Sequence, residues 1–184
     1  MFDSFRLSVS PGAALFYPLL LLTAEDWELI ALLGGILVHE AGHALALLCS
    51  GGRVRGLTLE LSGLRMDAAL PPSPRAEALC ALAGPAAGLL WSGIAAQIGG
   101  ERFLFASGLS ALLSLFNLLP CLPLDGGRAL LALSGRTRLL HTSGLFCSLG
   151  LLWAALRLRL NLTLLPALWL LCRQFSPELS KESL

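Results

Sequence analysis

Long apolar runs, separated by short polar or glycine-rich breaks, dominate this chain. Residues 29–49 are long enough for a full membrane span, because about 20 helical residues cross the hydrocarbon core of a bilayer. Three more runs predict spans of the same kind: residues 76–98, 103–119 and 139–156. Two shorter runs contain proline and predict tilted or only partly inserted helices: residues 9–23 and 160–172.

The pattern changes at residues 53–67. Leu57, Leu59 and Leu61 alternate with polar residues or glycine, and the alternation resumes after Ser62-Gly63. A period of two with a Ser-Gly break predicts a β-hairpin. A second interruption comes at residues 117–128, where two prolines break an apolar segment whose pattern resumes at residues 129–133.

These patterns predict an all-α polytopic membrane protein with about six transmembrane or re-entrant helices and a short β-hairpin after the second of them. We expect one membrane-embedded domain over residues 1–184, with its core at about 29–133 and a loose polar tail at 176–184. The composition agrees, because 55% hydrophobic and 14% charged residues are not typical of a soluble domain. The net charge of +1 gives no reason to expect nucleic acid as a partner. The five cysteines form no CxxC pair and are expected to be buried thiols.

The distribution of basic residues predicts the orientation. With six crossings and a cytoplasmic N-terminus, ten of the 13 Lys and Arg residues lie on the cytoplasmic side, and Arg102, Arg157 and Arg159 lie opposite. Positive charge is enriched in cytoplasmic loops, so this orientation is favoured. With this orientation, the polar cluster described next lies nearer the cytoplasmic face. We expect an integral protein of a bacterial cytoplasmic membrane.

A cluster of ionisable residues, His39-Glu40-Ala41-Gly42-His43, interrupts the run at 29–49. Histidines four residues apart share one face of a helix, and HExxH is the spacing of a zinc site with Glu as general base. Ionisable residues inside a bilayer cost roughly 2.5 kcal/mol or more each, so three within one turn indicate a functional site. The alternative is that His39 and His43 only pack between helices. Glu40 would then be a charge in the lipid with no function.

A hydrolytic zinc site usually has three protein ligands and a water. Asp125 is the candidate for the third ligand, because its expected depth in the membrane matches that of His39. His39 lies about 15 Å below the cytoplasmic end of its helix and Asp125 about 13 Å below the end of its own, if both stretches are helical. Cys121 is a weaker candidate. Asp125 could instead cap a helix that starts at Gly126, and Asn117 could hydrogen-bond a neighbouring helix.

Together, HEAGH and the later NLLPCLPLDGGR segment resemble the site-2 proteases, a family of intramembrane zinc metalloproteases. The resemblance covers residues 29 to about 133 and implies an LDG-type motif whose aspartate, Asp125 here, is the third zinc ligand. The family commonly has a Gly-Pro-x-x-Asn element on an intervening span. Here Gly84-Pro85 is kept, but Gly88 stands in place of Asn, which puts a polar role at that position in doubt. Gly84 and Gly88 also form a small-xxx-small face that lets helices approach closely.

The resemblance implies an intramembrane zinc metalloendopeptidase that cleaves transmembrane segments or membrane-tethered regulatory proteins. One Zn²⁺ is expected on His39, His43 and Asp125, with Glu40 as general base and Asn117 binding the substrate backbone or the oxyanion. The β-hairpin is expected either to bind unwound substrate as an added strand or to be a surface hairpin without substrate contact.

Other interpretations stay open at this point. PDZ or CBS-type regulatory domains of the family do not fit in 184 residues, so the layout is more similar to the sporulation-type branch, with control by a membrane partner or by prior trimming of the substrate. A non-proteolytic protein that binds or transports zinc is the main alternative, although a carrier should show polar residues along a path rather than at one depth. A silent scaffold for membrane helices is a third possibility, and the intact Glu40 argues against it.

Overall fold

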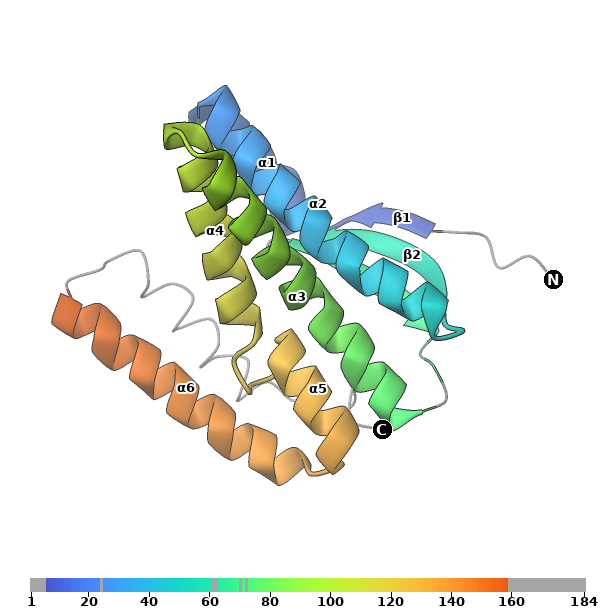
Figure 1. Ribbon diagram of the computed structural model, residues 1–184. Coiled ribbons are helices and arrows are strands. Elements are labelled where there is room, and N and C mark those ends of the chain that lie inside the picture. The colour runs from blue at the N-terminus through green and yellow to red at the C-terminus, as the bar shows by residue number, and fades with distance from the viewer. Residues whose placement is uncertain (1–5, 24, 61–62, 70, 72, 159–184) are drawn as a thin grey trace. The chain divides into compact units, whose positions relative to one another are not determined.

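The computed structural model describes residues 6–23, 25–60, 63–69, 71 and 73–158. The chain divides into two compact units, Met1–Phe116 and Asn117–Leu184. In the first unit the described elements are β1 (Arg6–Val9), α1 (Pro11–Thr23), α2 (Asp26–Cys49), β2 (Arg53–Glu60), β3 (Gly63–Ala69), α3 (Pro74–Ile98) and α4 (Glu101–Asn117, which ends one residue into the second unit) (Figure 1). The remaining elements of the second unit are α5 (Asp125–Ser134) and α6 (Thr137–Leu158).

Helix α2 begins three residues earlier than the apolar pattern predicts. Glu25 is its N-cap, and Glu25 and Glu28 form a reciprocal capping box with the first-turn backbone. Carboxylates are favourable at a helix N-terminus, where unsatisfied N–H groups carry partial positive charge. The acidic segment before the span is therefore the first turn of the helix. The helix ends at Cys49, and Gly51 follows with a left-handed φ of 79°.

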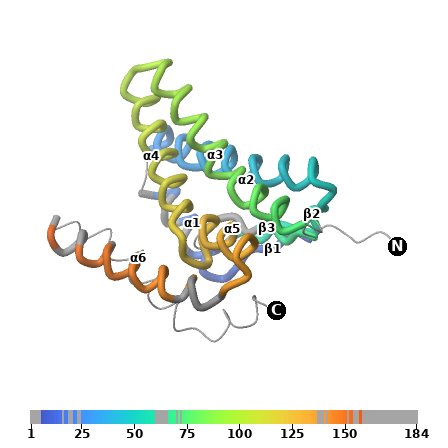
Figure 2. The backbone as a smooth tube through the Cα atoms, turned by 60° about the horizontal axis from the view of Figure 1, so that its bottom comes forward, coloured from blue at the N-terminus to red at the C-terminus, as the bar shows by residue number. Residues whose placement is uncertain are grey.

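Helices α3 and α4 form a hairpin around a two-glycine turn. Pro74 occupies the first turn of α3, where its missing N–H costs no hydrogen bond. Gly99 and Gly100 have φ values of 74° and 82°, which residues other than glycine rarely adopt. The chain reverses at these two residues and continues into α4. Figures 1 and 2 both show α3 between α2 and α4.

The interior of this three-helix packing consists of small side chains. The buried positions of α3 include Ala78, Ala81, Gly84 and Gly88, which recur at helical spacing on one face. The buried positions of α4 are Ala106, Ser110 and Ser114. Helices that associate in lipid use small residues at their contacts, because close backbone approach replaces the hydrophobic effect as the source of attraction.

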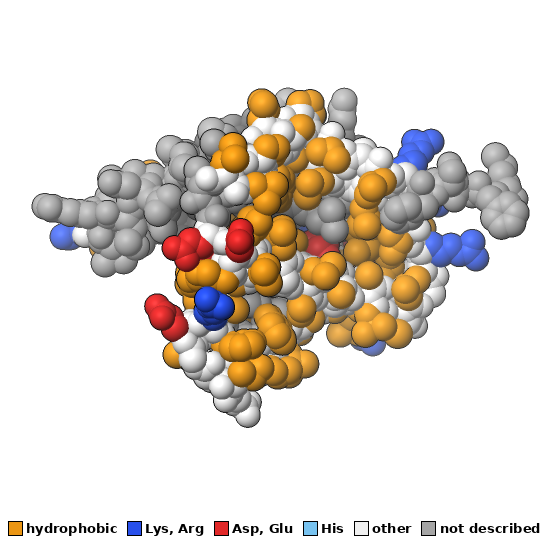
Figure 3. Space-filling model, turned by 90° about the horizontal axis from the view of Figure 1, so that it is seen from above, with side chains coloured by type: hydrophobic (Ala, Val, Ile, Leu, Met, Phe, Trp, Pro, Cys, Tyr) orange, Lys and Arg blue, Asp and Glu red, His pale blue; other side chains and the backbone are white. Residues whose placement is uncertain are grey.

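Many large apolar side chains of these helices are exposed on the outside of this packing. Leu37 and Leu45 of α2 and Leu90 of α3 are each about two-thirds exposed. Figure 3 shows hydrophobic side chains over much of one face. Among the described helices, α2 and α3 are long and apolar enough to cross a membrane, and only 11% of the apolar window of α2 is buried. The helical fold class is confirmed, whereas the predicted number of about six spans stays a prediction.

The β-hairpin is confirmed as β2 and β3, which pair antiparallel over the predicted residues and slightly beyond them. The sheet has a third strand that the sequence analysis missed. Strand β1 pairs parallel with β2, from Arg6 opposite Gly56 to Val9 opposite Leu59, so the strand order is β1-β2-β3. An alanine Cβ at position 56 would lie 2.7 Å from the Arg6 carbonyl oxygen. Glycine at that position therefore permits the pairing.

In the second unit, α5 is the short helix that follows the proline-rich break. It ends at Ser134, its C-cap Gly135 has a left-handed φ of 61°, and α6 starts at Thr137. The apolar run predicted at residues 160–172 and the tail predicted at 176–184 lie outside the described residues.

We predict that Gly42→Ala destabilises the protein and that Gly34→Ala, on the same helix, does not. A Cβ at Gly42 would lie 2.5 Å from the Ala83 carbonyl oxygen and 2.7 Å from the Ala87 Cβ, whereas a Cβ at Gly34 meets nothing within 4 Å. Overpacking costs about 1–3 kcal/mol, and replacing an unhindered helical glycine by alanine gains about 0.5–1 kcal/mol. The midpoint of thermal unfolding in detergent should fall for the first variant and stay or rise for the second. Equal midpoints would show that α3 does not approach α2 closely at Gly42.

Candidate metal centre

The two histidines of HEAGH lie one turn apart on α2 and converge. Their ring centroids are 4.8 Å apart with the planes at 79°, and their Nε2 atoms are 3.1 Å apart. His39 is buried and His43 is half-buried. Two imidazole nitrogens directed at the same point are the arrangement that a zinc ion requires of its histidine ligands.

A hydrogen bond from α3 determines which nitrogen of His43 is available. Its Nδ1 lies 2.8 Å from the carbonyl oxygen of Cys80. A carbonyl only accepts, so Nδ1 carries the proton and Nε2 keeps its lone pair. A metal-binding histidine usually donates its other ring N–H to a group such as a backbone carbonyl, and this hydrogen bond orients the ring.

Gly84 makes room for the same ring. A Cβ built on Gly84 would overlap three atoms of the His43 imidazole, including Nε2. The sequence predicts a general helix-packing role for Gly84, and the structure shows that the packed group is the His43 imidazole. The buried glycine and the Cys80 carbonyl together hold His43 from one face of α3.

Glu40 follows His39 on α2 and is half-buried. A carboxylate beside a zinc site is the usual general base of a hydrolytic HExxH motif. Its position on the same turn as His39 is set by the helix alone.

The remaining predicted site residues lie in the second unit. Asp125 is the first residue of α5 and is 7% exposed. The N-cap of α5 is Leu124, so Asp125 does not take the capping position that the sequence left open. Asn117 ends α4 and is half-buried.

The loop between them is folded tightly onto the start of α5. A Cβ at Gly127 would lie within 3 Å of the Cys121 backbone, and one at Gly126 would meet the carbonyl group of Leu118. The double glycine after Asp125 therefore permits the loop to pack against the helix. The Cys121 thiol is buried.

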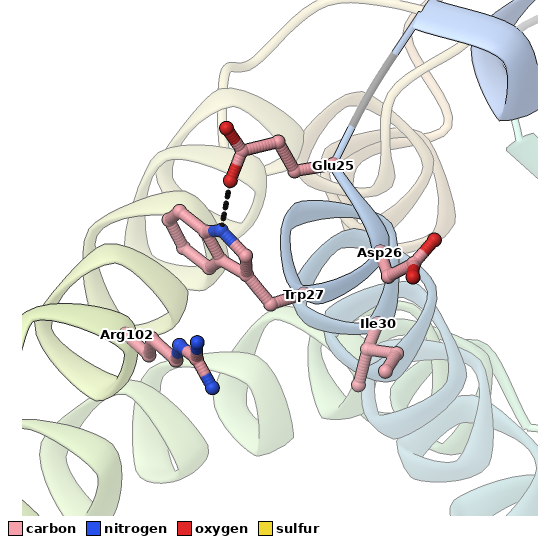
Figure 4. A pocket seen from close by; sticks show the side chains of 5 residues that line it. All are labelled: Glu25, Asp26, Trp27, Ile30 and Arg102. Carbon is pink, nitrogen blue, oxygen red and sulfur yellow. Dashed lines mark hydrogen bonds between the residues drawn. The ribbon is translucent and has the colours of Figure 1, made fainter.

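A pocket of about 570 Å³ lies at the other end of α2, lined by Glu25, Asp26, Trp27, Ile30 and Arg102 (Figure 4). The indole N–H of Trp27 donates to the Glu25 carboxylate at 2.6 Å. Ile30 precedes His39 by more than two helical turns, about 13 Å along the axis. This pocket is therefore separate from the histidine pair.

Comparison with known proteins identifies relatives by sequence. No protein-family model matches the chain. It is 36% identical over 111 residues to "Putative zinc metalloprotease sll0528" of Synechocystis, an alignment that covers 55% of this chain and 29% of that protein. It is 35% identical over 112 residues to "Putative zinc metalloprotease Rip3" of Mycobacterium tuberculosis, covering 54% and 28%. The chain thus spans less than a third of the length of these relatives.

A solved structure has the same fold. The site-2 protease from Methanocaldococcus jannaschii superposes with a TM-score of 0.66 at 23% identity, over 92% of this chain and 90% of that one. The sequence relatives carry the name zinc metalloprotease, and the structural relative supplies the fold. The chain is therefore similar in sequence to part of two proteins that are named zinc metalloproteases, and it shares its fold with a site-2 protease.

Proposed function

We propose that this chain is an intramembrane zinc metalloendopeptidase that cleaves transmembrane segments or membrane-tethered regulatory proteins. The observation that carries the proposal is the convergence of the two Nε2 atoms in HEAGH, with His43 oriented by the Cys80 carbonyl. The names of the sequence relatives and the fold of the structural relative support it. The two compact units would act as a single domain of about six membrane helices, N-terminus in the cytoplasm, in a bacterial cytoplasmic membrane.

The proposed ligands of one zinc ion are His39, His43 and Asp125. Among the described residues, these two imidazoles and one carboxylate are the candidate set of three metal-binding groups. The donor types fit zinc, which takes nitrogen and oxygen ligands and keeps an open position in catalytic sites. The space that Gly84 leaves for the His43 ring fits a ligand held in one orientation.

Bound zinc would lower the pKa of a coordinated water toward about 7 and polarise the scissile carbonyl. Glu40 would take the proton of that water and deliver it to the leaving amine. Asn117 is proposed to hydrogen-bond the substrate backbone or the oxyanion. A substrate helix has to unwind first, because its peptide groups are already hydrogen-bonded to one another.

The sheet offers a place for unwound substrate. In the order β1-β2-β3, the strand β3 has one partner, β2, among the described strands. An extended peptide can add to such an edge through backbone hydrogen bonds. We propose this role for β3, with a surface hairpin that does not touch substrate as the alternative.

We predict about one zinc per chain in detergent-purified protein and a sharp reduction in Asp125→Ala, because the third ligand is removed. Asp26→Ala is the matched control, since Asp26 is an exposed acidic residue at the start of α2. Elemental analysis of both variants beside the wild type measures the difference. Full zinc in Asp125→Ala would mean that the third ligand lies elsewhere, with Cys121 the first residue to test.

Gly84→Ala should weaken zinc binding about tenfold or more, the range seen when the support of a ligand is disturbed. The new methyl group would overlap the His43 ring. Gly93→Ala serves as the control on the same helix, because a Cβ there meets nothing within 4 Å. Competition with a chelator measures both affinities, and equal values would remove Gly84 from the site.

Glu40→Gln should lose about 10²–10⁴-fold in the rate of peptide cleavage while it keeps its zinc, because loss of a general base costs about that much. The assay is cleavage of a tethered transmembrane substrate in liposomes, with Glu77→Gln on α3 as control. Full turnover by a zinc-loaded Glu40→Gln protein would refute the assignment. Zinc flux across the same liposomes without any cleavage would favour the transporter alternative.

A further inference from the structure

One face of α4 carries a row of serines directed at α3. Ser107 and Ser92 of α3 are joined by a 3.1 Å hydrogen bond between their hydroxyl groups. One turn further, Ser110 donates to the carbonyl oxygen of Gly88 at 3.0 Å. Ser114 follows one more turn along the same face. The first two serines therefore have partners on α3.

Ser114 is different, because its hydroxyl is buried without a partner. Its side chain is 0% exposed, and no described protein atom forms a hydrogen bond with its Oγ. Its Oγ points at α3, where a Cβ on Gly88 would overlap it. Burying a hydroxyl without a hydrogen bond is unfavourable, so a partner is expected when the site is complete.

The packing of α2 on α3 brings Ser114 to the level of His39. Gly84 lies against the ring of His43, and Gly88, one turn along α3, lies against Ser114. Helix α2 runs antiparallel to α3, so one turn along α3 corresponds to one turn back along α2. One turn back from His43 is His39.

The contacts between α2 and α4 independently place Ser114 at the same height along the helices as His39. Trp27 of α2 stacks edge-on against Phe105 of α4, with centroids 4.9 Å apart. Further along, a Cβ on Gly35 would lie 3.8 Å from Ser110. Both helices run in the same direction here, so the residues one turn later, His39 and Ser114, share the next level.

We propose that Ser114 is a positioning residue for His39: its hydroxyl oxygen accepts a hydrogen bond from the His39 Nδ1–H when Nε2 binds the metal. The inference rests on the proposed zinc site. A metal-binding histidine almost always donates its other ring N–H to an acceptor, which sets the tautomer and the ring orientation. The Cys80 carbonyl does this for His43, and Ser114 does it for His39.

The test compares Ser114→Ala with Ser110→Ala in the full-length chain in detergent. Zinc affinity is measured by chelator competition, and stability by thermal unfolding of the zinc-free protein. Ser114→Ala should bind zinc about 10–100-fold more weakly without a lower unfolding midpoint, since alanine removes a buried hydroxyl that has no partner in the zinc-free protein. Ser110→Ala should lower the unfolding midpoint and leave the zinc affinity unchanged. It loses the hydrogen bond to the Gly88 carbonyl, but Ser110 has no proposed contact with a zinc ligand.

The outcomes separate this inference from the proposed function. A folded wild type without zinc overturns both. A wild type with one zinc and a Ser114→Ala variant of equal zinc affinity overturns only the role of Ser114. A Ser114→Ala variant whose unfolding midpoint falls as far as that of Ser110→Ala also overturns it, because the hydroxyl would then be structural.

Discussion

The close approach of α2 to α3 is the constraint on which the histidine pair depends. Glycine at positions 42 and 84 lets one backbone approach the other, and the His43 ring occupies the space that a side chain at Gly84 would need. At that separation the Cys80 carbonyl reaches Nδ1 of His43 at 2.8 Å. The hydrogen bond leaves the lone pair on Nε2, which faces His39. Helix packing thus determines which nitrogen of His43, a proposed zinc ligand, keeps its lone pair and where that nitrogen points.

The same packing accounts for the distribution of side-chain size. Small residues are buried between the helices, while leucines such as Leu37 and Leu90 remain exposed. In water this surface would be costly, but in lipid it is the favoured one, because lipid tails solvate leucine as well as another helix does. Polar groups that are buried in such a protein then need specific partners. Among the described residues, the buried polar side chains are His39, Ser110, Ser114, Asp125 and Ser148, and this requirement applies to each of them.

The hydrophobic pattern predicted most helices to within a few residues and the β-hairpin in its correct place. It failed where local sequence was ambiguous. Strand β1 is four residues long and pairs with β2, which follows two helices later in the chain. Its last residue, Val9, was assigned to the apolar run that follows. The start of α2 was placed late, because the pattern recorded hydrophobicity and not the capping box of Glu25. Asp125 was left open as a helix cap, and only the backbone of Leu124 shows which residue has that position.

The sequence by itself determined which residues can form the candidate metal centre on α2: HEAGH on an apolar helix specifies two histidines on one face with a glutamate beside them, because the period of the helix is a local property. It also indicated helix contacts through Gly84 and Gly88, but not what each glycine contacts. Only the tertiary structure assigned the Cys80 carbonyl to His43 and left the Ser114 hydroxyl buried opposite Gly88. These contacts join residues far apart in the chain, and their register depends on how backbones pack, which the spacing of residues within one helix does not encode.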